Sequence, residues 1–127
     1  MSVPGEGGPG LHRDEEFCYL TTTGRRSGRK HEIEIWFAFP PAGDGHTLYL
    51  MAGGREGADW IRNLLHDPAA TIRIANRSWP ATARPVEPDT AEDTLARELL
   101  CAKYQGWRSG QPLGEWGRTA LPLAFHL

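Results

Sequence analysis

The densest group of chemically useful side chains lies in residues 21–31, which read Thr-Thr-Thr-Gly-Arg-Arg-Ser-Gly-Arg-Lys-His. Arginine presents forked donors that suit phosphate or carboxylate, and glycine lets backbone N–H groups approach a ligand closely. The segment therefore predicts a loop that binds a small polyanion, against the alternative of a solvated cationic turn. The candidate donors are Arg25, Arg26, Ser27, Gly28, Arg29 and Lys30.

A second glycine-rich segment, Gly53-Gly54, precedes an expected helix over residues 59–66. Backbone N–H groups at a helix start point toward an anion or a carbonyl, so this segment is a second candidate binding site. Trp60 is either part of the core or a wall against an aromatic ligand. Asn63, on the same helix, is expected to hold the loop in place rather than to contact the ligand.

Aromatic side chains gather in and around residues 106–117, a segment expected to be irregular. They could pave the mouth of a pocket or form a hydrophobic lid without chemistry. Tyr104 is the candidate proton donor, and Trp36 and Trp107 are the candidates for substrate contact.

The histidines and cysteines predict no metal site. Five histidines are scattered without helical ligand spacing, and the two cysteines follow no metal or redox pattern. We expect Cys18 and Cys101 to be reduced and partly buried. No serine occupies the sharp strand–helix turn of a nucleophile elbow.

The elements that position these residues are expected in the order three strands, a helix, two strands, a helix and a last strand. Short connections and few helices favour a mainly β (α+β) antiparallel barrel over a doubly wound sheet. Asp59 and Asp89 are the expected N-caps, and the second helix should bury Leu95, Leu99 and Ala102. The strands are expected at 17–23, 33–39, 47–51, 71–74, 78–85 and 120–127, with a hairpin loop over 40–45, and the second helix at 89–104.

The chain has 127 residues and a formal net charge of −2, which suits one domain with no general attraction for nucleic acid or membranes. No stretch approaches the ~20 apolar residues of a membrane span, and no signal core is evident, so we expect a cytoplasmic protein. Residues 1–14, rich in Gly and Pro, are expected to be a flexible segment before a domain over residues 15–127.

Four segments resemble the deazaflavin (F420)-dependent nitroreductase and quinone reductase family. The resemblance implies a split β-barrel of the FMN-binding kind that holds coenzyme F420, a deazaflavin with a phosphate and an oligoglutamate tail. It assigns phosphate and tail to residues 25–30, and the deazaflavin to Ala52, Gly53, Gly54 and Trp60. The segments are Leu20 to Gly28, Gly53-Gly54, Trp60 to Pro68 and Arg118 to Pro122.

The implied activity is an F420H2-dependent reductase that transfers a hydride to a small quinone, enone or nitroaromatic. Such an enzyme needs an anion clamp, an apolar wall for a planar ring and an open face, because the cofactor performs the hard step. Two alternatives are an FMN-binding reductase of the same fold and a non-catalytic lipid or cofactor carrier. A homodimer is left open.

Overall fold

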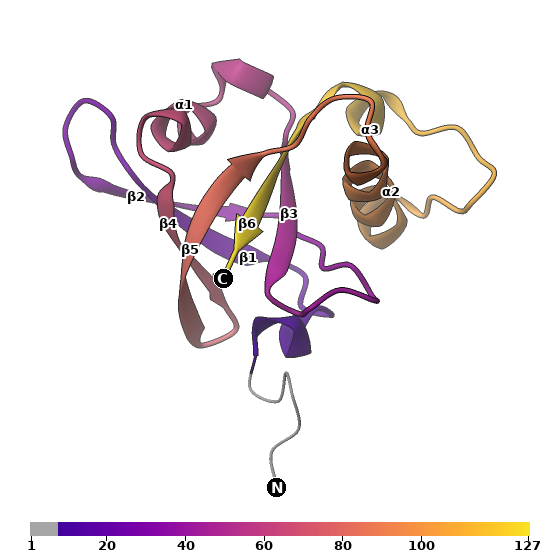
Figure 1. Cartoon of the computed structure of the whole chain (residues 1–127), viewed down its shortest axis with the longest axis horizontal. Helices are drawn as coiled ribbons and strands as arrows, with labels where there is room; N and C mark the ends of the chain where they lie inside the picture. The colour runs from indigo at the N-terminus through magenta and orange to yellow at the C-terminus, as the bar shows by residue number, and fades with distance from the viewer. Residues whose placement is uncertain (1–7) are drawn as a thin grey trace, which may run out of the picture.

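Six antiparallel strands form one curled sheet in the computed structural model, which describes residues 8–127 (Figure 1). The strand order is β2-β1-β4-β5-β6-β3, so β2 and β3 are the two edges. Chain neighbours pair in the β1–β2 and β4–β5 hairpins. The strands are β1 Cys18–Thr23, β2 Lys30–Ile35, β3 Thr47–Ala52, β4 Ala69–Ile74, β5 Arg77–Pro85 and β6 Leu121–His126.

The two edges of the sheet approach each other after β2 ends. Ala38 and Tyr49 form an isolated antiparallel bridge, with backbone N···O distances of 3.2 and 2.9 Å. This single bridge brings the chain after β2 against β3 and leaves the barrel split elsewhere. The expectation of an antiparallel split barrel is thus confirmed.

Two details of this region differ from the sequence-based expectation. The strand expected over 33–39 begins at Lys30 and ends at Ile35, and the loop over 40–45 joins no paired hairpin of strands. The reason is the strand order, which places β2 and β3 at opposite edges of the sheet, and the curl of the sheet then brings Ala38 alone against β3.

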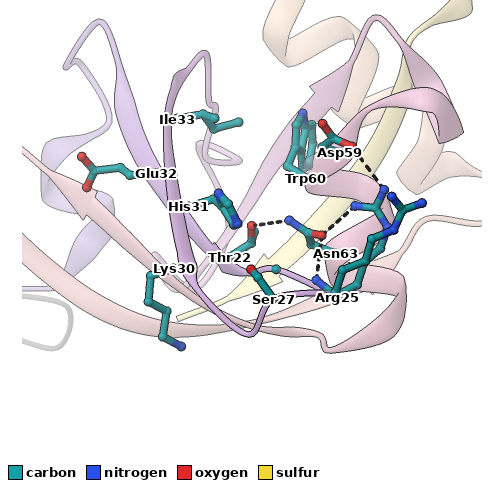
Figure 2. Close-up of a pocket in the computed structure, with 12 residues that line it drawn as sticks. Thr22, Arg25, Ser27, Lys30, His31, Glu32, Ile33, Asp59, Trp60 and Asn63 are labelled. Atoms are coloured by element: carbon teal, nitrogen blue, oxygen red, sulfur yellow. Dashed lines mark hydrogen bonds and ion pairs between the residues drawn. The ribbon is translucent and has the colours of Figure 1, made fainter.

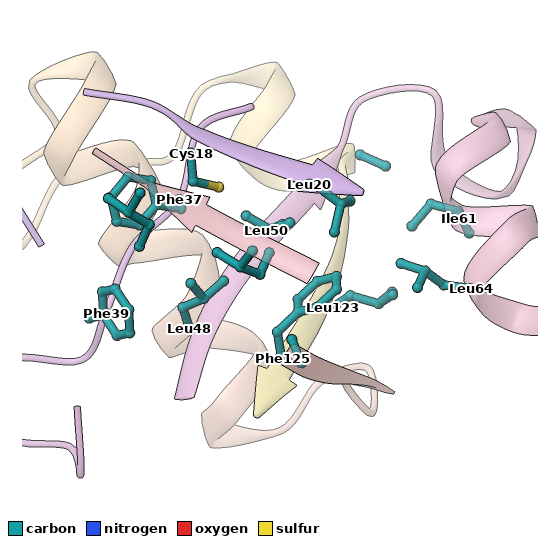
Figure 3. Close-up of a cluster of buried hydrophobic side chains, with 14 residues drawn as sticks. Cys18, Leu20, Phe37, Phe39, Leu48, Leu50, Ile61, Leu64, Leu123 and Phe125 are labelled. Carbon is teal, nitrogen blue, oxygen red and sulfur yellow. The ribbon is translucent and has the colours of Figure 1, made fainter. Parts of the chain in front are cut away.

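The main core fills the inside of the curl (Figure 3). Phe37, Phe125 and Leu50 have no measurable exposure there. β3 is buried at almost every position, because its other face carries Tyr49 and Met51 against α2, where Ala96 and Leu100 complete a second cluster. Apolar burial on both faces fixes the register of β3.

Three α-helices cover the sheet: α1 Asp59–His66, α2 Ala91–Gln105 and α3 Glu115–Thr119. Figure 1 shows α1 beside the β1–β2 turn, and α2 and α3 together on the other side of the sheet. Two helices were expected, and α3 begins inside the segment over 106–117 that was expected to be irregular and ends two residues beyond it. None of the helices in the described part of the chain combines the length and apolarity needed to cross a membrane.

The expected caps are wrong at both long helices. The N-cap of α1 is Ala58, which makes no side-chain cap bond. The N-cap of α2 is Thr90, whose hydroxyl accepts from the backbone N–H of Asp93 at 3.2 Å. Asp89 instead has a φ of 61°, outside the helix.

The buried face of α2 also differs from the expected one. Leu95 is 37% exposed and Ala102 is exposed, while Ala96, Leu100 and Cys101 are buried. Packing against β3 and α3 selects this face, which the weak apolar periodicity of α2 did not identify.

The N-terminal segment is described from Gly8 onward, and residues 1–7 lie outside the described residues. A 3₁₀ helix, η1 Pro9–His12, buries Pro9 and Gly10, and the N–H of Gly10 donates to Gly45 O at 2.9 Å. This part therefore docks on the loop before β3. Both cysteines are free and buried, as expected.

Candidate functional site

A cavity of about 590 Å³ opens beside the β1–β2 turn (Figure 2). It brings together two features that the sequence singled out separately, the cationic loop and Trp60 of α1. The cavity is lined by Thr22, Gly24, Arg25, Arg26, Ser27, Lys30, His31, Glu32, Ile33, Asp59, Trp60 and Asn63.

The cationic loop has a defined turn geometry. The N–H of Gly24 donates to Arg29 O at 2.7 Å, and the N–H of Gly28 donates to Gly24 O at 2.9 Å, with Gly28 at a φ of 73°. The Ser27 hydroxyl oxygen accepts from the N–H of Arg29 at 3.1 Å. The O–H proton of Ser27 therefore remains available for a ligand at the cavity wall.

A larger residue at Gly24 would require the neighbouring side chains to shift. A Cβ there would lie 2.7 Å from His31 Nε2 and 2.9 Å from Ser27 Oγ. The imidazole thus packs directly on the glycine and lines the cavity. His31 was not among the expected site residues, although it directly follows the cationic run.

Arg25 is held by α1. Its backbone N–H and its guanidinium donate to Asn63 Oδ1 at 3.2 and 2.9 Å, and its Nη2 lies 3.3 Å from Asp59 Oδ1. Asn63 in turn donates to Thr22 Oγ1 at 3.2 Å. Asn63 therefore holds the cationic loop in place. The sequence had led us to expect that it would hold the glycine-rich segment before its own helix instead. Arg25 is partly committed to this contact with α1.

The other cationic side chains of the loop make fewer hydrogen bonds than Arg25 does. Lys30 Nζ donates to Thr23 Oγ1 at 2.8 Å and retains two further protons. The Arg26 and Arg29 side chains are exposed and make no hydrogen bond or ion pair with residues that the structure describes. Arg26 and Lys30 line the cavity, whereas Arg29 lies outside its lining. The arrangement can bind a phosphate or carboxylate at this end.

Ala52, Gly53 and Gly54 lie apart from this cavity. Ala52 is the last residue of β3, and the two glycines join it to η2 Arg55–Gly57. Ala52 is buried, and a Cβ on Gly53 would lie 3.3 Å from two atoms of the Trp116 indole. Arg55 donates from its guanidinium to Thr119 O. The glycine turn is therefore tied to the end of α3 and flanks Trp116.

Trp116 belongs to a second cavity of about 270 Å³, lined by Phe17, Glu34, Ile35, Trp36, Met51 and Trp116. Trp36 meets Trp116 edge to face at 5.4 Å and stacks on Tyr104 at 4.5 Å between ring centroids. Trp36 thus lines a cavity, as its candidate role requires. Glu34 was not among the expected site residues.

Strand β2 connects the two cavities. Its first residues, Lys30 to Ile33, line the cavity beside the β1–β2 turn, called the cationic cavity below. Glu34 and Ile35 line the second cavity, beside Trp116, called the aromatic cavity. At ~3.3 Å per residue, the path from Lys30 to Trp36 spans about 20 Å. An anionic ligand and a planar ligand could therefore bind next to each other along β2, one in each cavity.

Tyr104 lies on α2 with its hydroxyl directed at the backbone. The hydroxyl oxygen is 3.1 Å from both N and O of Phe37 and 2.8 Å from Glu16 O. Burial raises the pKa of Tyr104 to about 12. Tyr104 lines neither cavity, so its stacking on Trp36 is its link to the site.

Trp107 lies in the segment between α2 and α3. Its indole N–H donates to Gln111 O at 2.9 Å, and it lines neither cavity. Within the described residues, no group of three His, Cys, Asp or Glu side chains could hold a metal ion.

A family of known proteins matches most of this sequence. The family model described as F420H(2)-dependent quinone reductase matches residues 3–113. No protein among the curated ones matches the chain.

Solved structures share the fold. One described as an F420 reductase is 20% identical, with a TM-score of 0.63 over 98% of this chain and 94% of its own. One described as an F420-H2 dependent reductase is 17% identical, with a TM-score of 0.63 over 88% and 94% of the two chains. One described as a domain-swapped dimer is 19% identical, with a TM-score of 0.66 over 87% and 80%.

At such identities the solved structures support the split-barrel fold alone, whereas the family model spans most of the sequence and includes the cationic loop, Trp60 and Trp36. The chain therefore belongs to the F420H2-dependent quinone reductase family and is an oxidoreductase that uses coenzyme F420.

Proposed function

We propose that the protein reduces a small conjugated acceptor, a quinone, an enone or a nitroaromatic, with F420H2 as the hydride donor. The observation that carries this proposal is the pair of cavities along β2, one cationic and one aromatic. With this arrangement the cofactor would bind in the cationic cavity and the planar acceptor in the aromatic cavity.

The donor set of the cationic cavity fits the cofactor. Arg26, Lys30 and the O–H of Ser27 are available to a phosphate or to glutamate carboxylates. Trp60 and Ile33 offer apolar surface to a planar ring at the other side of the same cavity. Several cations beyond one phosphate site favour a long anionic tail, which F420 has and FMN lacks.

When bound and reduced, the deazaflavin supplies a hydride, and one proton completes the reduction of a quinone to its hydroquinone. The residues of the chain have the tasks of holding, orienting and shielding. Trp36 and Trp116 would contact the acceptor, while Asn63 keeps the cationic loop in place. The proton would come from solvent, because the Tyr104 hydroxyl is occupied by backbone groups.

Fluorescence titration of the purified protein with F420, and separately with FMN, tests the choice of cofactor. We expect F420 to bind with a micromolar or lower Kd, about −8 kcal/mol, and FMN to bind clearly more weakly. Turnover of F420H2 with menadione, cyclohexenone and a nitroaromatic then ranks the acceptors. Stronger binding of FMN would support the alternative cofactor, and F420 binding without turnover would support a carrier.

A homodimer remains a prediction that light scattering can test.

A further inference from the structure

The aromatic cavity has one charged side chain in its lining, the carboxylate of Glu34. Its other lining residues are aromatic or apolar: Phe17, Ile35, Trp36, Met51 and Trp116. A ligand in this cavity would therefore experience the charge of Glu34 without a compensating cation in the wall.

Nothing in the described residues pairs Glu34 with a cation. Its Oε2 accepts a hydrogen bond from the hydroxyl of Tyr19, its partner across β1 and β2, at 2.7 Å. Arg73 stacks over the Tyr19 ring at 4.1 Å, but its guanidinium is directed to Glu32 Oε1 at 3.4 Å. The Glu34 carboxylate therefore has no ion-pair partner among the described residues.

Further acidic residues precede the cavity in the chain, and the two nearby cations, Arg73 and Lys103, are engaged with other groups. The segment that leads into Phe17 reads Asp14-Glu15-Glu16. Lys103 is the cation on the nearby face of α2, and its ammonium donates inward to Arg13 O and Phe37 O at 2.8 and 3.1 Å. The two ends of β2 therefore differ in charge, cationic near Lys30 and acidic near Glu34.

We propose that Glu34 makes the aromatic cavity selective for neutral or cationic planar acceptors and against anionic ones. This inference rests on the proposed function, because it assigns the acceptor to that cavity. The physical reason is Coulomb repulsion at short range: Glu34 is exposed, but a ligand in the cavity lies within the Debye length of about 10 Å at 0.1 M salt, so the repulsion is only partly screened. The opposite charges at the two ends of β2 would also direct the anionic tail of the cofactor to the cationic loop and away from the aromatic cavity.

Glu34→Gln tests the proposal, because glutamine removes the charge and keeps an oxygen that can accept from Tyr19. Glu87→Gln, on an exposed residue between β5 and α2, is the matched control. The probes are 1,4-naphthoquinone and its 2-sulfonate, which share a ring system and differ by one negative charge. Quenching of tryptophan fluorescence gives their Kd values without turnover, and kcat/KM with F420H2 gives the same comparison during catalysis.

We expect wild type to prefer the neutral quinone, and Glu34→Gln to improve the relative affinity and kcat/KM of the sulfonate about three- to tenfold. The control should leave the ratio unchanged, and the Kd of F420 should not move in either variant. An unchanged ratio of Kd values in Glu34→Gln overturns the inference. Reduction of neither quinone contradicts the proposed function instead, and the binding ratio still decides the role of Glu34.

Discussion

The side-chain oxygen of Asn63 accepts hydrogen bonds from both the backbone N–H and the guanidinium of Arg25, 38 residues earlier in the chain. The amide nitrogen of Asn63 donates to Thr22 Oγ1 at 3.2 Å. One buried side chain on α1 thus holds the end of β1 and the start of the cationic loop together, as Figure 2 shows. The geometry of the anion site therefore depends on a residue that need not touch the anion.

Asn63→Ala is expected to lower the free energy of unfolding by about 1–3 kcal/mol, because it leaves the buried Thr22 hydroxyl and the Arg25 amide without this partner. It should also weaken F420 binding by roughly tenfold, since the loop is no longer preorganised. Urea denaturation and fluorescence titration measure the two effects. Asn76→Ala, in the β4–β5 turn, is the control, and an unchanged urea midpoint for Asn63→Ala would contradict this role.

Arg26→Ala and Arg25→Ala should separate ligand binding from support of the loop. Arg26 has no internal partner among the described residues, so its loss should weaken F420 binding by about 1.5–3 kcal/mol and leave Tm unchanged. Arg25→Ala should lower both F420 affinity and Tm, because Arg25 is bonded to Asn63 and Asp59. The binding losses should shrink as salt rises. Normal binding by both variants at low salt would mean that the loop is only a solvated turn.

Tyr104→Phe keeps the ring on Trp36 and removes the hydroxyl that bridges Glu16 and Phe37. We expect a stability loss of about 1–3 kcal/mol from the unpaired backbone groups, with kcat changed little. Thermal unfolding and steady-state rates with a quinone distinguish the two roles. A rate loss of roughly 10²-fold with unchanged stability would instead identify Tyr104 as a general acid.

Gly53→Ala should affect the aromatic cavity, because the added Cβ would lie 3.3 Å from the Trp116 ring and the ring must move. We expect KM for a quinone to change several-fold while the Kd of F420 changes less. Gly57→Ala is the matched control, since its added Cβ meets no atom within 4 Å. Identical kinetics in the two variants would argue that Trp116 does not contact the acceptor.

The interactions of Glu92 with Arg84 and Tyr49 predict that the folded protein loses stability in acid. Arg84 binds both carboxylate oxygens at 2.7 and 2.8 Å, Tyr49 donates to one of them, and together they lower the pKa of Glu92 to about 2. A pKa that is lower in the folded state stabilises the protein above the ordinary value of 4.5, and this contribution is lost as pH falls toward 2.

Glu92→Gln should therefore be less stable than wild type at pH 7, with the difference shrinking as pH falls from 4.5 toward 2. Urea midpoints of the two proteins across this range provide the measurement. A difference that stays constant with pH would mean that the pair contributes no pH-dependent stability.

The sequence by itself determined the features that depend on near neighbours in the chain. Alternating apolar residues predicted the strands, and the short connections predicted an antiparallel barrel. The cationic loop could be found because its donors are consecutive residues in one turn. Trp60 could be placed beside this loop only through the family resemblance.

Tertiary structure alone decided which side chains meet across long stretches of chain. β2 and β3 lie at opposite edges of the sheet, and its curl brings the residues after β2 against β3. Trp36 then meets Trp116, and both line the aromatic cavity. The face that α2 buries and the partners of the Tyr104 hydroxyl depend on packing against the sheet. Glu34 looks like an ordinary polar position of an alternating strand, and its place in a cavity wall follows from the barrel being open at that edge. Local patterns carry no information on such contacts, because their energy depends on distances that only the folded chain defines.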